Sequence, residues 1–343
     1  MHKGKEVTIY DLASKLNISV ATVSRALKDN AVVSKTTKKR IADLAEQMGY
    51  RSNHFASNLR QQKTNTIGII VHELNSTFIT SVLAGIEKVA TEAGYDLMIT
   101  HSAESRVKEA ANANNLFHKR VDGIIASLAF DTTNLDHFKP FADKGIPVMF
   151  FDRVEEGGSD TVVIIDNYKS GYKATQHLID QGCKRIAHIT SSLKRNVYSQ
   201  RYKGYMDALR DNGIAFDEKL VLVKNLSESS AIESAKEVLE MKPMPDGAFF
   251  TSDFVAAVFM RTIKQHHINI PEDIAIVGFN NDAIGKLVEP TLSTMDYPGK
   301  EVGEIAARTL VNHLNGLSSI HQNNSIIVHS ELIVRESSVK KKK

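Results

Sequence analysis

From residue 66 onward, short runs of apolar residues alternate with longer segments in which apolar residues recur every three or four positions. The short runs are rich in β-branched residues and predict buried strands, whereas the longer segments predict helices with one apolar face. The predicted strands are 66–71, 97–101, 123–127, 147–151, 161–165, 185–190, 247–251 and 274–278, and the clearest helical segments are 79–93, 169–181, 199–212, 231–241 and 254–266. This alternation predicts βαβ units, with parallel sheets covered by helices on both faces.

The alternating segments divide into two halves near residue 164. A weak internal repeat supports this division, because 119–124 and 184–189 both place basic residues before a buried strand. Doubly wound sheets bind ligands outside the carboxyl ends of their strands. We therefore predict an α/β body of two doubly wound parallel-sheet lobes, with a ligand-binding cleft between them and the connecting segments as a hinge.

The first fifty residues follow a different pattern, which is that of three short helices. Residues suited to cap a helix (Thr8, Ser19 and Ser34) precede segments 9–16, 20–27 and 35–48. Asn17 suits a left-handed turn after the first segment, and Gly49 ends the third. In the second segment Val23, Ala26 and Leu27 are spaced to form one inward stripe. The pattern predicts a helix-turn-helix.

In a helix-turn-helix, the second helix enters the major groove and its N-terminal side chains meet base edges. Thr22, Ser24 and Arg25 could donate hydrogen bonds to bases or phosphates, and Val20 and Ala21 could make apolar contacts, for example with a thymine methyl group. The alternative for this segment is a small structural three-helix bundle.

Charge separates the first segment from the rest of the chain. Residues 1–63 hold twelve lysine and arginine residues against five acidic ones, a net charge of +7, whereas residues 64–339 have a net charge of −8. A basic head on an acidic body indicates that the head meets a polyanion. Chance clustering of charges is the alternative explanation.

Composition excludes several other classes of protein. The hydrophobic fraction of 42% argues against wholesale disorder, and no apolar run reaches the length of about 18 residues that a membrane span needs. The first residues also lack a secretory apolar stretch, so we expect a cytoplasmic protein. Cys183 is the single cysteine and cannot form an internal disulfide.

Motifs for catalysis or cofactor binding are missing from the sequence. No Gly-x-Gly-x-x-Gly follows the strand at 66–71, and no phosphate-binding Gly-x-x-x-x-Gly-Lys-Ser/Thr loop occurs. His266 and His267 are adjacent, so on a helix they would face different directions and could not bind one metal together. Basic neighbours could lower the pKa of Cys183, but no paired base is apparent. We expect no enzyme activity, no cofactor and no metal site.

Taken together, these motifs resemble the LacI/GalR family of transcriptional repressors. The similar segments are VTIYDLA (7–13), SVATVSRAL (19–27), VS (33–34), GY (49–50), IGIIV (67–71), RVDGII (120–125), FDR (151–153), DIAIVGF (273–279) and LIVRES (332–337). They span nearly the whole chain. Asn17 departs from the family pattern, which usually has glycine there, and it should preserve the turn because asparagine tolerates a left-handed conformation.

The resemblance implies a domain organisation. It places a DNA-binding domain at 1–50, a hinge segment at 51–63 and an effector-binding and dimerisation domain of the periplasmic-binding-protein type I fold at 64–343. The chain would cross between lobes near 163–165, 292–295 and 322–326, giving one lobe of 64–163 with 294–323 and a second of 164–293 with 324–339.

The hinge segment is predicted to be a conditional helix. Residues 51–60 could form two helical turns, and a helix this short is marginal in water unless something packs against it. In the resembled family, paired hinge helices enter the minor groove and a leucine wedges between base pairs, which kinks the duplex. Leu59 matches that leucine, Ala56 matches the small packing residue, and Asn53 would cap the helix. The alternative is an inert tether.

Candidate effector-binding residues lie at strand ends. They are Asn75, Phe78, Arg153, Arg195, Arg201, Ser252, Asp253 and Asn280, a set suited to hydroxyl-rich or carboxylate ligands through directed hydrogen bonds. By resemblance, Arg201 and Asn280 match effector-binding positions of the family, and Arg195 and Phe78 match positions used by some members. Asn280 replaces a usual aspartate, which leaves the ligand class open. Asp253 could instead cap a helix, and Phe78 could belong to the core.

Two hypotheses follow from the sequence. The first is an effector-responsive repressor that binds a pseudo-palindromic double-stranded DNA operator as a homodimer. It would hold a small metabolite between its lobes, and the resemblance implies a carbohydrate. The second is a cytoplasmic solute-binding or sugar-modifying protein whose helical head does not bind DNA.

Overall fold

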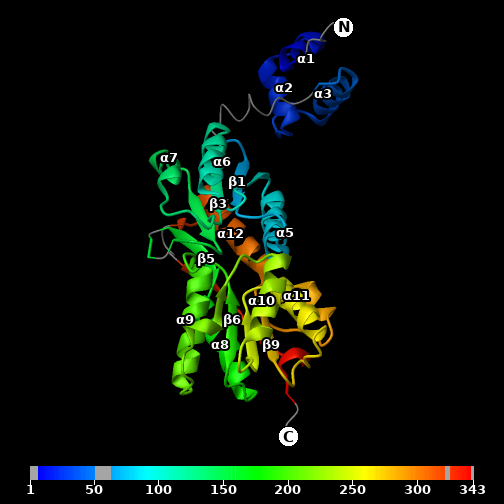
Figure 1. The fold of residues 1–343 in the computed structure, drawn as a ribbon. Helices are drawn as coiled ribbons and strands as arrows, with labels where there is room; N and C mark the ends of the chain where they lie inside the picture. The colour runs from blue at the N-terminus through cyan, green and yellow to red at the C-terminus, as the bar shows by residue number, and fades with distance from the viewer. Residues whose placement is uncertain (1–6, 51–62, 156, 159, 321–324, 341–343) are drawn as a thin grey trace, which may run out of the picture. The chain divides into compact units, whose positions relative to one another are not determined.

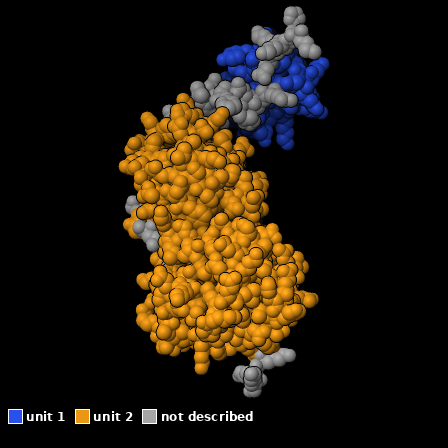
Figure 2. All heavy atoms as spheres, viewed as in Figure 1, with its two compact units in different colours: residues 1–64 blue, residues 65–343 orange. Residues whose placement is uncertain are grey.

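The computed structural model describes residues 7–50, 63–155, 157–158, 160–320 and 325–340. The chain forms two compact units, residues 1–64 and residues 65–343 (Figure 2). We call them the head and the body and describe each separately. The predicted hinge residues Asn53, Ala56 and Leu59 lie outside the described residues.

The head contains three helices, as the sequence predicts. They are α1 (Ile9–Leu16), α2 (Val20–Leu27) and α3 (Lys35–Gln47). Thr8 and Asp11 form a reciprocal capping box at the start of α1, and Ser19 and Ser34 cap α2 and α3. Asn17 has a φ of 52° and ends α1 in the left-handed conformation. The turn therefore forms without the glycine that is usual there.

The head has a hydrophobic core of its own. It consists of Leu12, Ala13, Val23, Ala26, Val33, Ile41 and Ala45. The prediction that Leu27 points inward is wrong, because 39% of this residue is exposed. Leu27 is the last residue of α2, and Val33, in the connection to α3, is buried instead.

The body contains two six-stranded sheets, which confirms the predicted two-lobed α/β architecture (Figure 1). The first sheet has the order β11-β5-β4-β3-β1-β2 and is parallel throughout. Its strands are β1 (Thr66–Val71), β2 (Asp96–His101), β3 (Gly123–Ala126), β4 (Val148–Phe151), β5 (Thr161–Ile165) and β11 (Ser325–Val328). The buried strands coincide closely with the apolar runs in the sequence.

The second sheet has the order β12-β10-β9-β8-β6-β7, with β12 antiparallel to β10. Its strands are β6 (Ile186–Thr190), β7 (Val221–Val223), β8 (Gly247–Phe250), β9 (Ala275–Asn280), β10 (Ser293–Asp296) and β12 (Leu332–Ile333). The sheets place the lobe crossings after β5, β10 and β11. Each crossing therefore lies a few residues beyond the predicted position, because the predicted boundaries would cut β5 and β10 and would assign β11 to the other lobe.

Helices cover both sheets. In the first lobe they are α5 (Thr77–Glu92), α6 (Arg106–His118), α7 (Lys139–Asp143) and α12 (Gly299–Leu314), and in the second they are α8 (Asn167–Asp180), α9 (Asn196–Asp211), α10 (Glu228–Glu240) and α11 (Asp253–Lys264). Short 3-10 turns lie at η1 (Asp136–Phe138), η2 (Glu218–Leu220), η3 (Ala283–Lys286) and η5 (Glu336–Ser338). Among the described residues, no helix is long and apolar enough to cross a membrane.

Glycines set the distance between α8 and α9. A Cβ atom at Gly171 would lie 2.2 Å from the backbone oxygen of Arg201, and one at Gly204 would lie 2.2 Å from the backbone oxygen of Tyr168. No side chain fits at such distances, so the two helix backbones are in direct contact. This contact fixes the backbone from which the Arg201 side chain enters the cleft.

Candidate DNA-binding and effector sites

The surface of α2 presents most of the residues predicted to meet DNA. Ala21 and Arg25 are exposed, and Thr22 and Ser24 are half-buried. Val20 is also half-buried, and its side chain packs against the head core, so it stabilises the head. The Thr22 hydroxyl lies 2.8 Å from that of Ser19, which uses part of its hydrogen-bonding capacity at the helix start.

Thr8 and Ser34 are exposed but already have local partners. The Thr8 hydroxyl donates to Asp11 Oδ2 at 2.7 Å, and the Ser34 hydroxyl lies 2.9 Å from that of Thr37. Both residues therefore act first as helix caps. Tyr10, which we did not predict as a site residue, is 65% exposed on α1. In the sequence, the exposure of Tyr10 is indicated only by its position off the buried face of α1.

The body contains a cavity of about 380 Å³ between its lobes, which we call the interlobe cavity. Six of the eight predicted effector residues line it: Asn75, Phe78, Arg153, Arg201, Ser252 and Asn280. They come from both lobes, from the ends of β4 and β9 and the starts of α5 and α11, with Arg201 from within α9. Most of the residues predicted from strand ends therefore lie together around this cavity.

Arg201 is the most constrained of these residues. Its guanidinium carbon lies 3.5 Å from the centre of the Phe279 ring, and its Nε donates to Asn167 Oδ1 at 2.9 Å. The side chain is almost fully buried. An arginine held in this way has little rotational freedom left to lose when it binds a ligand.

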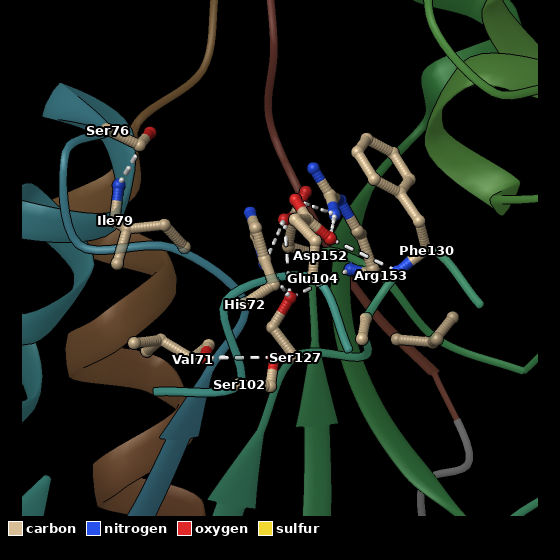
Figure 3. Close-up of polar contacts among 12 residues, drawn as sticks. Val71, His72, Ser76, Ile79, Ser102, Glu104, Ser127, Phe130, Asp152 and Arg153 are labelled. Carbon is tan, nitrogen blue, oxygen red and sulfur yellow. Dashed lines mark hydrogen bonds and ion pairs between the residues drawn. The ribbon is translucent and has the colours of Figure 1, made fainter. Parts of the chain in front are cut away.

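Arg153 is held differently, because a carboxylate neutralises its charge (Figure 3). Its Nη1 lies 2.7 and 2.8 Å from the two carboxylate oxygens of Glu104, and its Nη2 donates to the Tyr198 hydroxyl at 3.2 Å. The guanidinium carbon also lies 4.1 Å from the centre of the Phe130 ring. Tyr198 belongs to the second lobe, so Arg153 links the two lobes.

Asp152 connects the interlobe cavity to the segment that follows β10, where the chain crosses between the lobes. It has a φ of 58°, and its Oδ1 accepts a hydrogen bond from the Tyr297 hydroxyl at 3.0 Å. Its Oδ2 accepts from the Ser127 hydroxyl at 3.4 Å, and Ser127 also contacts His72 Nδ1 at 2.9 Å. Burial raises the pKa of Asp152, although nearby Arg153 opposes the rise.

His72 lies at the end of this network and is neutral. Burial, reinforced by the positive charge of Arg153, holds its pKa well below 6.5. A neutral imidazole has one donor and one acceptor nitrogen. His72 therefore contributes hydrogen bonding to the cavity but no positive charge.

Two predicted effector residues do not line the interlobe cavity. Arg195 is buried at the start of α9 and donates through Nη2 to the backbone oxygen of Thr132 in the first lobe. Asp253 is fully buried, and its carboxylate accepts from the Thr294 hydroxyl at 2.7 Å and from the Asp282 amide at 2.8 Å. Both side chains bond to protein groups rather than facing the cavity.

In the wild type, the free energy of unfolding should fall as the pH rises, because Asp253 loses its proton. Asp253→Asn is expected to make this fall smaller. Burial raises the pKa of Asp253 to about 7, against 3.8 for a free side chain. The folded form therefore binds this proton more tightly than the unfolded chain. The stability that this contributes is present below about pH 4 and is lost as the pH rises to about 7, by up to about 1.4 kcal/mol per pH unit.

An asparagine could accept from the Asp282 amide through its oxygen and donate to the Thr294 hydroxyl through its nitrogen. The melting temperature of this variant should therefore change less between pH 5 and pH 8 than that of the wild type. The exposed Asp96, changed to asparagine, provides the control and should leave the pH dependence as it is. If the melting temperatures of the wild type and Asp253→Asn depended on pH in the same way, the raised pKa of Asp253 would be contradicted.

Several residues around the interlobe cavity are not among those predicted from the sequence. Tyr198, Phe254, Asp282 and Tyr297 all line the interlobe cavity, and Phe254 is 42% exposed. Cys183 is buried, and burial raises its pKa to about 11, so its basic neighbours do not activate it. No group of three or more possible metal ligands comes together among the residues that the structure describes.

A helix-turn-helix head and a two-lobed body with a polar cavity define a class of protein, the DNA-binding regulator with a ligand-binding domain. Comparison with known proteins agrees with this class. Residues 8–53 match the family described as "Bacterial regulatory proteins, lacI family", and residues 175–338 match "Periplasmic binding protein-like domain".

Among relatives, catabolite control protein A of Priestia megaterium is 31% identical over 312 residues, which cover 90% of this chain and 93% of that protein. The chain therefore belongs to the LacI family and is a DNA-binding transcriptional regulator. Its fold is shared with the lac repressor dimer bound to operator and the anti-inducer ONPF (TM-score 0.86, 21% identity, 98% and 100% of the two chains).

A second solved structure is similar to the body. It is a periplasmic binding protein/LacI transcriptional regulator from Alkaliphilus metalliredigens in complex with D-xylulofuranose, with a TM-score of 0.69 and 28% identity. The match covers 80% of this chain and 100% of that chain.

Proposed function

We propose that this protein is a repressor that binds a pseudo-palindromic operator as a homodimer and responds to a small carbohydrate bound between its lobes. The observation that best supports the effector is the interlobe cavity, where polar residues of both lobes meet. A ligand that contacts both lobes favours one arrangement of the lobes over others. The protein would thus bind its ligand rather than transform it, within the cytoplasm.

The cavity residues suggest how a carbohydrate would be held. The Arg201 guanidinium and the Asn75 and Asn280 amides offer directed donors, and the amides and the Ser252 hydroxyl also offer acceptors. Phe254 gives the cavity an exposed aromatic ring, which suits the apolar face of a sugar. The sugar bound by the similar regulator from A. metalliredigens supports this ligand class.

Homodimer formation is supported by the edges of both sheets. The outermost strands β2 and β7 carry exposed apolar residues, Ile99 at 47% and Val223 at 49% exposure, and Val107 on α6 is 78% exposed. Exposed apolar residues along a sheet edge favour association. A second copy would cover them symmetrically, and two heads would then meet two operator half-sites.

The proposal predicts that ligand binding changes operator affinity. A thermal-shift screen of neutral sugars, sugar phosphates and nucleobases would first identify a ligand that raises the melting temperature of the full chain. Adding that ligand should then change the operator dissociation constant by about 5- to 150-fold, the usual range of coupling between sites. Fluorescence anisotropy at one fixed salt concentration measures the change. A ligand that binds tightly but leaves operator affinity unaltered would refute effector control.

A further inference from the structure

A second cavity of about 460 Å³ adjoins the interlobe cavity. It is bounded by the start of α5, the end of β9 with its following loop, and the second lobe crossing with the start of α12. We call it the hinge-side cavity; residues that line only this cavity include Ser81, Asn281, Asp296, Lys300, Glu301 and Glu304. None of the eight candidate effector residues is unique to it.

The two cavities lie side by side and share part of their lining. Thr77, Phe78, Asn280, Asp282 and Tyr297 line both. The rings of Phe78 and Tyr297 stack with centres 4.0 Å apart, and both are more than 90% buried. These rings form an apolar wall that both cavities share, and the polar residues Asn280 and Asp282 also line both cavities.

Asp282 is held firmly in this shared lining. Its backbone amide donates to the buried Asp253 carboxylate at 2.8 Å. The side chain of the neighbouring Asn281 makes two further hydrogen bonds. Its Nδ2 donates to Asp296 Oδ1 at 2.9 Å, and its Oδ1 accepts from Arg335 Nη2 at 2.7 Å. The loop after β9 is therefore fixed on both sides, and it presents a carboxylate where the two cavities meet.

The charges around both cavities disfavour an anionic ligand. In the hinge-side cavity, Lys300 is outnumbered by Asp282, Asp296 and Glu301, and Glu304 pairs with Lys88 at 3.0 Å. In the interlobe cavity, Glu104 neutralises Arg153, and His72 is uncharged. Arg201 is thus the one cavity-lining guanidinium without a carboxylate partner among the described contacts, and Asp152 lies near it.

Three of the four helix N-termini beside the interlobe cavity are already capped by side chains, and that of α9 has no side-chain cap. Beside the hinge-side cavity, the N-terminus of α12 also lacks a side-chain cap, but it carries the acidic Glu301 in its first turn. A phosphate commonly binds free amides at a helix N-terminus. Here the N-termini of α5, α10 and α11 are capped by Ser76, Ser227 and Ser252, whose side chains accept from backbone amides of the first turn. Carboxylates, amides and hydroxyls remain, and these suit hydroxyl groups.

We propose that the effector is an extended neutral polyol of two sugar units, with one unit in the interlobe cavity, the second in the hinge-side cavity and Asp282 at the junction. The inference rests on the proposed function, because it assumes an effector between the lobes. Each cavity alone lies within the range of small-molecule sites, about 300–1,000 Å³. A single sugar ring would leave one of them without ligand.

The test compares neutral disaccharides, their constituent monosaccharides and the 6-phosphates of those monosaccharides by titration calorimetry on the full chain. The best disaccharide should bind about tenfold or more tightly than its monosaccharides. The phosphates should bind more weakly than the parent sugars, because the acidic side chains repel them. Phosphates that bind best, or a panel in which no neutral sugar binds, would overturn the proposed ligand class.

Ser81→Tyr isolates the second cavity, because Ser81 lines the hinge-side cavity only. The larger side chain should remove the advantage of the disaccharide, bringing it within about twofold of the monosaccharide, and leave monosaccharide binding unchanged. Thr91→Tyr, three turns along the same helix and exposed, should alter neither affinity.

Two outcomes would overturn the inference while leaving effector control intact. One is monosaccharide binding that equals disaccharide binding in the wild type. The other is a Ser81→Tyr variant with unchanged disaccharide selectivity but weaker self-association in sedimentation velocity, which would assign the hinge-side cavity to a second copy of the chain. Failure of the proposed function would appear separately, as ligand binding without any effect on operator affinity.

Discussion

A chain that lacks residues 1–64 is expected to lose specific operator binding entirely. The head contains the helix-turn-helix, including the exposed Ala21 and Arg25 of α2, and it forms a compact unit with its own core. Specific binding by regulators exceeds non-specific binding by about 10³-fold or more, so the truncated chain should lose at least that factor. Fluorescence anisotropy with a duplex selected by the full-length protein from a randomised library measures it.

The body should remain folded in this experiment, because the head core contains no body residue. Its melting temperature and its response to ligand are therefore expected to match those of the full chain. Val23→Asp in the full-length chain is a matched control: it places a charge in the head core, where Val23 is fully buried, and should cause a similar loss of operator binding. Specific binding that survives both changes would place the DNA site elsewhere.

The head could be predicted in detail because its local signals agree with one another. Capping residues and the left-handed Asn17 act within one or two helical turns, and each appears in the structure as predicted. The predicted inward stripe of α2 is present at Val23 and Ala26. The stripe is wrong at Leu27, which is exposed, and Val20 is half-buried. Which end of a short apolar stripe is buried depends on the loop that follows, and the spacing within α2 does not contain that information.

The body was predictable where strands are buried on both faces. Runs such as Thr66–Val71 are continuously apolar, and this pattern distinguishes them from their surroundings. The short strands β7 and β12 have too few residues for any period to appear. Helix α12 was not singled out because small residues such as Gly303, rather than large apolar ones, face α5.

The candidate effector site was only partly predictable. Strand ends indicate where a cleft lies, and this argument placed Arg153, Arg201 and Asn280 correctly at the cavity. It could not give the direction of a side chain, so it also selected Asp253, which points into the second lobe. Glu104 was missed because its partner, Arg153, is distant in sequence and only the fold brings the two together.

Arg201→Met is expected to weaken effector binding strongly while preserving operator binding. Arg201 faces the interlobe cavity, and its guanidinium is already fixed by Phe279 and Asn167. A charge-assisted hydrogen bond from such a group contributes about 1.5–3 kcal/mol, so effector affinity should fall by about 10- to 150-fold. Titration calorimetry measures this loss, and anisotropy without ligand should show operator affinity within about twofold of wild type.

Arg210→Met separates the role of the cavity from that of helix α9. Arg210 is on the same helix, but its side chain is 69% exposed and pairs with Asp207 and Asp211 at the surface. It should therefore leave effector affinity unchanged. Melting temperatures of both variants identify any general loss of stability, which would lower ligand binding for a different reason. If Arg201→Met folds normally and binds effector as tightly as Arg210→Met, the guanidinium does not contact the ligand, and the interlobe cavity is not the effector site as we have assigned it.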